Sequence, residues 1–139
     1  MGNIVLSLLV DNTSGVLSRV SGLFSRRGYN IDSVTVGETE NPAYSRMTVA
    51  VSGDEASLIQ IKKQLNKLED VVTIVELESG KSVCRELVLV KVKATPSERK
   101  DIISVADIFR ANIVDVSKES VIIELTGTTT KCEAFLRLL

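Results

Sequence analysis

The fold is indicated most clearly by residues 4–28, which have the sequence IVLSLLVDNTSGVLSRVSGLFSRRG. The first seven residues are apolar apart from one serine, as expected of a central strand covered on one or both faces. Turn formers follow at 11–15, and apolar residues then recur at the spacing of an amphipathic helix. Two arginines and a glycine end the stretch, which is typical of a helix C-terminus. The stretch therefore predicts a strand, a tight turn and a helix.

The next residues predict three more strands and a second helix. Strands are expected at 29–36 and around 46–51, where apolar and more polar residues alternate. Ser52-Gly53-Asp54-Glu55 supplies helix-start chemistry before an apolar helical stripe at 58–68. A fourth strand is expected at 71–77. The order β-α-β-β-α-β predicts a ferredoxin-like sandwich of one antiparallel sheet with two helices on one face.

A similar cycle follows a linker at residues 78–85. It begins with a strand at 86–94 and the sequence Thr95-Pro96-Ser97-Glu98, a capping box with proline at the first helical position. A helix, two further strands and a last helix from about Thr129 complete it. The chain then stops without a closing strand, so we expect either that a partner covers the gap or that the natural protein continues.

The predicted fold class is therefore α+β, with two ferredoxin-like (βαββαβ) sandwiches in tandem. They occupy residues 1–77 and 86–139, and the second lacks its last strand. The halves also resemble each other, since VSGLF followed by NI at 20–31 is echoed by VADIF followed by NI at 105–113. Either a duplication or two independent copies of one helix-to-strand unit would produce this similarity.

Composition narrows the function classes. The 139 residues carry 17 basic and 18 acidic side chains, a net charge of −1, without the basic footprint usual in nucleic-acid binding. The longest apolar run is far too short to span a bilayer, and the N-terminus has neither a secretory nor a transit pattern. We therefore expect a cytoplasmic protein that binds neither nucleic acid nor membrane.

Residue types also argue against catalysis. The chain has no histidine, the commonest general base and metal ligand, although a carboxylate or lysine could still act. Cys84 and Cys132 match no metal-ligand spacing and are interpreted as reduced structural thiols. No phosphate-cradling glycine loop is present either. We expect no catalytic residue, no metal site and no cofactor in this chain.

The turn Asp11–Leu17 carries the best candidate binding chemistry. The first N–H groups of a helix lack internal partners and are partly positive, so a carboxylate fits there. Gly15 would allow close approach to the backbone, and the Asn12 amide could both donate to and accept from a zwitterion. Val16 and Leu17 could contact an aliphatic side chain. The alternative is a helix cap by Asn12 or Ser14, with glycine easing the turn.

A family resemblance then adds to these observations. Residues 9–20 and 22–33 resemble the ACT domain of the acetohydroxyacid synthase (acetolactate synthase) small subunit, a regulatory subunit. SRMT at 45–48, IKKQLNKL at 61–68, ELVLVKV at 86–92 and IFRANIVDV at 108–116 extend the match over nearly the whole chain. GYNI at 28–31 and the IFRxNI segment are more specific than the glycine turn.

The resemblance implies a non-catalytic subunit that activates a catalytic subunit and confers feedback inhibition, usually by valine, in branched-chain amino acid biosynthesis. Thiamine diphosphate, FAD and magnesium would belong to that catalytic partner. ACT domains of the family pair side by side as dimers, with the effector at the interface. The effector-binding residues implied for this chain are Asn12, Ser14, Gly15, Val16, Leu17, Asn30 and Ile31.

Alternatives remain for two of these residues and for the function. Asn30 could simply close the helix-to-strand turn, and Ile31 could be ordinary core. The chain could be an ACT-domain sensor of another amino acid that regulates a different enzyme or a transcription factor. It could also be an enzyme itself or a nucleic-acid-binding regulator, although the missing histidine and the near-neutral charge argue against these.

Overall fold

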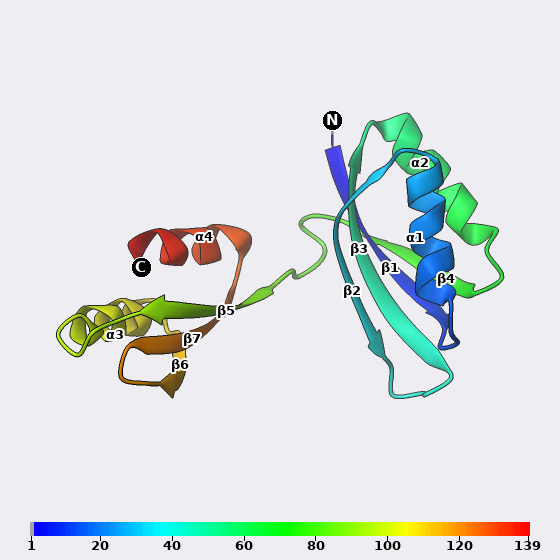
Figure 1. Ribbon diagram of the computed structural model, residues 1–139. Helices are drawn as coiled ribbons and strands as arrows, with labels where there is room; N and C mark the ends of the chain where they lie inside the picture. Colours follow the sequence, from blue (N-terminus) through cyan, green and yellow to red (C-terminus); the bar gives the residue numbers. More distant parts are fainter. Residues whose placement is uncertain (1) are drawn as a thin grey trace. The chain divides into compact units, whose positions relative to one another are not determined.

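The computed structural model describes residues 2–139, and the chain divides into two compact units at the boundary between Ser82 and Val83. The first unit is a four-stranded antiparallel sheet with two helices on one face (Figure 1), and its strand order is β2-β3-β1-β4. Its elements are β1 (Gly2–Asp11), α1 (Val16–Arg26), β2 (Asn30–Glu38), β3 (Tyr44–Gly53), α2 (Glu55–Asn66) and β4 (Val71–Leu77). This is the ferredoxin-like arrangement that the sequence predicts.

Alternation along the strands builds the core of the first unit. Leu6 and Leu8 of β1 pair with Val49 and Met47 of β3, and all four side chains are almost completely buried. The helices cover this face, with Phe24 among the side chains that they contribute. Burial of each such side chain stabilises the fold by roughly 1.5–3 kcal/mol, so the sheet-to-helix interface holds the strand-to-helix turns in place.

The second unit is a smaller version of the same plan. Its elements are β5 (Glu86–Lys93), α3 (Arg99–Ile108), β6 (Asn112–Val116), β7 (Ser120–Gly127) and α4 (Thr129–Leu138). The sheet has the order β5-β7-β6, so β5 is an edge strand and the prediction of a missing closing strand is confirmed for the described residues. Its core includes Phe109 and Phe135, whose rings meet edge-on at 5.2 Å between centroids.

Two predicted boundaries shift by a few residues. The second strand begins at Asn30 and extends to Glu38, because pairing with β3 continues past the expected end. Helix α3 begins at Arg99, not directly after Thr95. A tighter turn precedes it, in which the Glu98 amide donates to the Thr95 carbonyl at 3.1 Å. The predicted capping box is nevertheless formed by reciprocal side-chain and backbone bonds between Thr95 and Glu98.

Helices α1 and α3 end in the same way. Gly28 has a φ of 72°, and Arg110, at the equivalent place in the second unit, has a φ of 57°. In both units the amide of the next residue donates to a carbonyl five positions back, which is a Schellman motif. These bonds are Tyr29 N to Phe24 O, 3.1 Å, and Ala111 N to Ala106 O, 2.8 Å. The sequence echo between the halves therefore has a structural counterpart.

Candidate functional site

Gly15 ends the turn that connects β1 to α1, and the backbone there requires glycine. Its φ is 86°, in the left-handed region, and a Cβ at this position would stand 2.8 Å from Nη1 of Arg19. Gly15 is also the N-cap of α1, which has no side-chain cap. The alternative of a cap by Asn12 or Ser14 is therefore wrong. The first N–H groups of α1 keep the partial positive charge of a helix N-terminus.

Asn12 holds the turn against the loop between β2 and β3. Its backbone N–H donates to the carbonyl of Ala43 at 2.8 Å, and its Nδ2 donates to the carbonyl of Pro42 at 2.9 Å. Its Oδ1 accepts from the hydroxyl of Ser45, a buried residue, at 3.1 Å. One N–H and one lone pair of the exposed amide remain for a ligand. Asn12 thus fixes the shape of the turn, a role that the sequence did not indicate.

The two apolar residues after the turn have different environments. Val16 is 4% exposed and belongs to the core of the first unit, so its side chain supports the turn from below. Leu17 is 49% exposed and offers an apolar surface next to the turn. Ser14 is exposed at the turn itself. Of the predicted contacts to an aliphatic ligand, Leu17 is the residue whose side chain is accessible.

Asn30 and Ile31 open β2. Asn30 is exposed, and its Nδ2 donates to Oδ1 of Asp32 at 2.8 Å. The other carboxylate oxygen of Asp32 accepts a bond from the hydroxyl of Ser52. Ile31 is partly buried and packs against the core, next to an irregularity in the β2–β3 register. The side chain of Ile31 thus serves the core, while Asn30 lies at the surface beside a carboxylate.

Within one chain the two groups of predicted residues lie at opposite ends of the sheet. Asp11, which precedes the turn, pairs with Tyr44 at one end of β3, whereas Asn30 pairs with Ser52 at the other. Ser52 follows Tyr44 by eight positions along β3, a distance of about 27 Å at roughly 3.4 Å per residue. One copy of the chain therefore does not bring Asn12 and Asn30 together.

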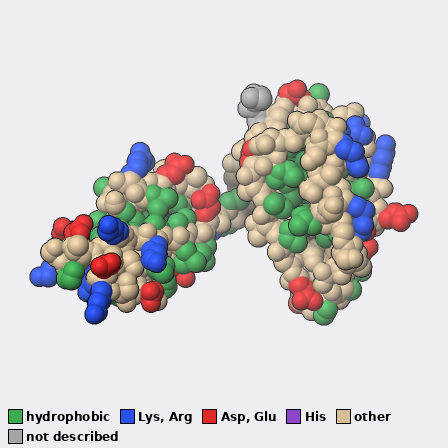
Figure 2. All heavy atoms as spheres, viewed as in Figure 1, with side chains coloured by type: hydrophobic (Ala, Val, Ile, Leu, Met, Phe, Trp, Pro, Cys, Tyr) green, Lys and Arg blue, Asp and Glu red, His purple; other side chains and the backbone are tan. Residues whose placement is uncertain are grey.

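Strand β2 is an edge of the first sheet and has apolar side chains at its surface. Val34 and Val36 are 46% and 44% exposed. In the register they lie opposite Val49 and Met47, so they are on the face that the helices cover. Figure 2 shows hydrophobic side chains gathered over β2 and beside α1. An unpaired edge strand with an apolar margin is suited to pairing with another strand.

An ion pair that the sequence analysis did not identify lies beside the turn. Arg19 of α1 donates from Nε to Oδ2 of Asp70 at 2.5 Å and from Nη2 to Oδ1 at 3.1 Å. The hydrogen bond from Arg19 holds the pKa of Asp70 below its ordinary value, and the same bond raises the pKa of Arg19. The two residues are far apart in the sequence and share no periodic pattern, so only the fold reveals the pair.

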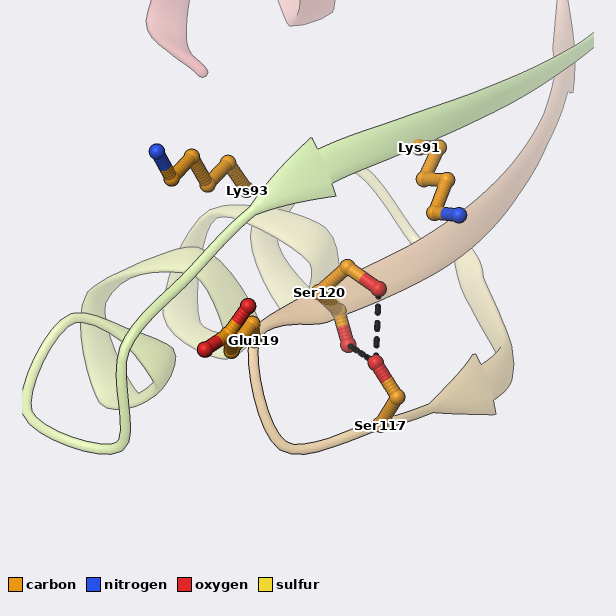
Figure 3. Close-up of a pocket in the computed structure, with 5 residues that line it drawn as sticks. All are labelled: Lys91, Lys93, Ser117, Glu119 and Ser120. Atoms are coloured by element: carbon orange, nitrogen blue, oxygen red, sulfur yellow. Dashed lines mark hydrogen bonds between the residues drawn. The ribbon is translucent and has the colours of Figure 1, made fainter.

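Two surface hollows are found in the described residues, and the second borders the β1–α1 turn, because its lining residue Tyr44 pairs with Asp11. The larger, of about 530 Å³, is on the second unit and is lined by Lys91, Lys93, Ser117, Glu119 and Ser120. Figure 3 shows the two lysine side chains extending in different directions, while the two serine hydroxyls bond to each other at 2.7 Å. The other, of about 410 Å³, is lined by Leu9, Glu38, Thr39, Glu40, Asn41, Tyr44 and Arg46. Neither hollow includes a predicted effector residue.

Two broader features complete the survey of residues 2–139. No group of three or more cysteine, aspartate or glutamate side chains is placed to hold a metal ion. None of the helices in this part of the chain has both the length and the apolar character needed to cross a membrane.

Comparison with known families matches both units. Residues 6–73 match the family described as an AHAS small subunit-like ACT domain, and residues 85–139 match the small subunit of acetolactate synthase. The acetolactate synthase small subunit of Mycobacterium avium is 54% identical over 96% of this chain and 80% of its own length. That of Haemophilus influenzae is 50% identical over 97% of this chain and 83% of its own length.

A solved structure agrees over the full chain. The acetolactate synthase small subunit from Thermotoga maritima has a TM-score of 0.93 and 42% sequence identity, and the match covers 100% of this chain and 87% of that one. The match extends across both units, and the fold described above is therefore shared with it in each.

Proposed function

Because the chain belongs to the acetolactate synthase small-subunit family, we propose that it is a non-catalytic regulatory subunit. It activates a catalytic subunit of acetolactate synthase in the cytoplasm and makes that enzyme sensitive to feedback inhibition. Thiamine diphosphate, FAD and magnesium belong to the catalytic partner. The observation that carries the proposal is the family match of both units, at about half identity to relatives over nearly the whole chain.

The effector in this proposal is valine, bound at the turn before α1. The uncapped first turn of the helix offers N–H donors and a positive dipole end to the carboxylate. The half-exposed Leu17 is available to the aliphatic side chain. Leucine and isoleucine should compete, since one methylene changes affinity by only roughly 1–3 kcal/mol in an apolar pocket.

Two copies complete the site. If the β2 strands of two copies pair antiparallel about a twofold axis, the start of one β2 lies beside the end of the other. Asn30 and Ile31 of the second copy then lie at the end of the sheet that carries Asn12 and Gly15 of the first. The same pairing buries Val34 and Val36. The separation of Asn12 and Asn30 within one chain and the free β2 edge both support this arrangement.

Regulation follows as a linkage between valine and the state of the dimer. Valine that bridges two copies favours the arrangement of the paired sheets in which both halves of its site are in contact. An effector shifts such an equilibrium only through its different affinities for the two states, typically about 1–3 kcal/mol of coupling. The catalytic partner responds to that shift.

The test combines the purified chain with an acetolactate synthase catalytic subunit. We expect acetolactate formation to rise when the chain is added and to fall again when valine is titrated in. The chain alone should give no turnover. Activation that responds to another amino acid in a panel would identify a different effector, whereas absence of both activation and binding of any amino acid would refute the proposal.

A further inference from the structure

Arg19 is the charged residue nearest to the glycine of the turn. It follows Gly15 by one helical turn, and its backbone amide donates to the Gly15 carbonyl at 2.9 Å. Side chains of a helix point towards its N-terminus, so the Arg19 side chain returns towards the turn. A Cβ on Gly15 would be 2.8 Å from Nη1 of Arg19 and 3.6 Å from Cζ. The guanidinium therefore lies directly beside the Cα of Gly15.

Asp70 holds the guanidinium in that place. Its carboxylate binds the Nε and Nη2 edge of Arg19 with two hydrogen bonds, and its backbone carbonyl accepts from the amide of Asp11 at 2.9 Å. Asp70 is thus fixed to the end of β1, immediately before the turn. Its side chain is 18% exposed, against 50% for Arg19, so the supporting carboxylate is more buried than the arginine.

The remaining edge of the guanidinium faces the turn. A guanidinium has five N–H donors, and the two bonds to Asp70 use Nε and Nη2. Within residues 2–139 no hydrogen bond from Nη1 is found, and Nη1 is the Arg19 atom nearest to the Gly15 position. Asp70 balances the charge of Arg19, so what Nη1 adds to the helix N-terminus is a pair of oriented, charge-assisted donors.

We propose that Arg19 is a specificity residue of the effector site, with Nη1 as the donor to the effector carboxylate and Asp70 as the residue that positions it. The inference rests on the effector site proposed above and adds a side chain to it. Arg19 distinguishes an α-carboxylate from an uncharged group at the same atom. Backbone amides alone would discriminate less between the two groups, because they are neutral donors and only the helix dipole favours the anion.

The experiment compares valine with valinamide, which replaces the carboxylate by a neutral amide, using calorimetry on the full chain. The unsubstituted chain should bind valine at least about tenfold more tightly than valinamide. Arg19→Met should weaken valine binding by about tenfold to a hundredfold and valinamide binding by clearly less, because the amide carbonyl is a neutral acceptor. The preference for the carboxylate should therefore fall to the part that the helix N-terminus alone supplies.

Three further variants separate recognition from folding. Arg19→Lys keeps the charge but not the planar fork, and it should retain part of the preference. Asp70→Asn keeps one oxygen acceptor but loses the second hydrogen bond and the charge that hold the Arg19 guanidinium in place. Valine binding should therefore fall, but by less than in Arg19→Met. Arg27→Met removes an exposed arginine at the other end of α1 and should change neither affinity. Melting curves establish that each variant is folded.

The outcomes distinguish the two proposals. If the unsubstituted chain binds valine and Arg19→Met retains the full preference over valinamide, Arg19 has no such role and the effector site itself stands. A loss of valine and valinamide binding together in both Arg19→Met and Arg19→Lys also overturns the inference, because the residue then acts on the fold of the turn. If the unsubstituted chain binds no amino acid, the proposed function fails as well.

Discussion

The turn from β1 into α1 and the turn from β5 into α3 stand at equivalent places in the two units, but their donors are satisfied differently. In the second unit, Glu98 accepts from the backbone amide of Thr95 at 3.2 Å and from its hydroxyl at 2.8 Å. In the first unit, the helix begins at Gly15 without any side-chain cap. The turn before α3 thus contains a side-chain carboxylate that bonds to its own backbone, although Glu98, the N-cap of α3, has no side-chain cap of its own. No bond of this kind is found in the turn before α1.

In the proposed function, this difference between the two turns explains why the effector binds to the first unit and not to the second. The capping box satisfies the amides of Thr95 and Glu98 in the turn before α3 and stabilises that turn without a ligand. A helix that lacks a cap gives up that stabilisation, and a bound anion can supply it instead. In the proposed function, the first unit is therefore the sensor, and the second unit has a structural turn at the corresponding place.

The largest expected effect comes from a substitution in the turn before α1. In Gly15→Asp, the new Cβ would meet the Arg19 guanidinium at a left-handed backbone position, and the new carboxylate would pair with Arg19 and repel the effector. We expect valine affinity in calorimetry to fall by more than about a hundredfold. Gly80→Asp is the matched control, because Gly80 has a φ of 87° with nothing close to its Cβ position. Normal valine binding by Gly15→Asp would show that the site lies elsewhere.

The next prediction concerns dimerisation and compares the edge strand β2 of the first sheet with the edge strand β6 of the second. Val34→Lys combined with Val36→Lys places charges where a second copy is proposed to pair, and buried unpaired charges are costly. We expect the dimer to dissociate at concentrations about a hundredfold higher, as measured by analytical ultracentrifugation. Val114→Lys with Val116→Lys makes the same change on β6, where both valines are also half-exposed, and should leave the dimer intact. Equal effects of the two pairs would contradict pairing through β2.

A smaller effect should appear in the stability of the second unit at acid pH, through Glu98 in the turn before α3. Hydrogen bonds from Thr95, first from its hydroxyl, lower the pKa of Glu98. Stability from this carboxylate is complete above its unfolded pKa of about 4.3 and is lost as the pH falls through the lower folded value. Between pH 5 and pH 2, melting of the second unit should shift more in the unsubstituted chain than in Glu98→Gln. The exposed Glu119→Gln serves as control, and identical pH profiles for Glu98→Gln and the unsubstituted chain would refute this role.

The smallest effect concerns the ends of α1 and α3. A non-glycine residue in the left-handed conformation costs about 1–2 kcal/mol, while glycine loses about 0.5–1 kcal/mol more entropy on folding. Arg110→Gly should therefore stabilise the second unit by roughly 0.5–1 kcal/mol, and Gly28→Ala should destabilise the first by a similar amount. Urea unfolding followed separately for each unit measures both changes. A destabilised Arg110→Gly would mean that the arginine side chain makes up for the backbone strain.

The sequence predicts the fold well because local signals agree with it. The apolar periods, the turn formers and the capping box each indicate an element that the structure contains, and errors are limited to boundaries such as the start of α3. Such boundaries depend on whether a turn is tight or fully helical, which differs by one hydrogen bond. Strand order and the free β5 edge follow from the ferredoxin-like plan.

The candidate site is less predictable because its geometry depends on contacts between distant residues. The sequence identifies the turn as a candidate site but leaves open whether Asn12 or Ser14 caps the helix. The bonds that fix Asn12 to Pro42 and Ser45, and Arg19 to Asp70, join residues that are far apart in the sequence. No spacing rule connects such positions. Val16 shows that a place next to the turn in the sequence does not establish contact with a ligand. Its position suggested such contact, but its side chain is buried in the core.

Amide hydrogen exchange along β5 can show whether another strand is paired with the free edge of that strand. One edge of β5 pairs with β7, whereas the other has no neighbouring strand among residues 2–139. Along an antiparallel edge strand, alternate N–H groups point away from the sheet, so every second β5 amide should exchange rapidly and the others slowly. A strand laid against β5 by any partner would slow the rapid set alone. The exchange pattern of these few amides would therefore show when that edge is occupied, even inside a much larger assembly.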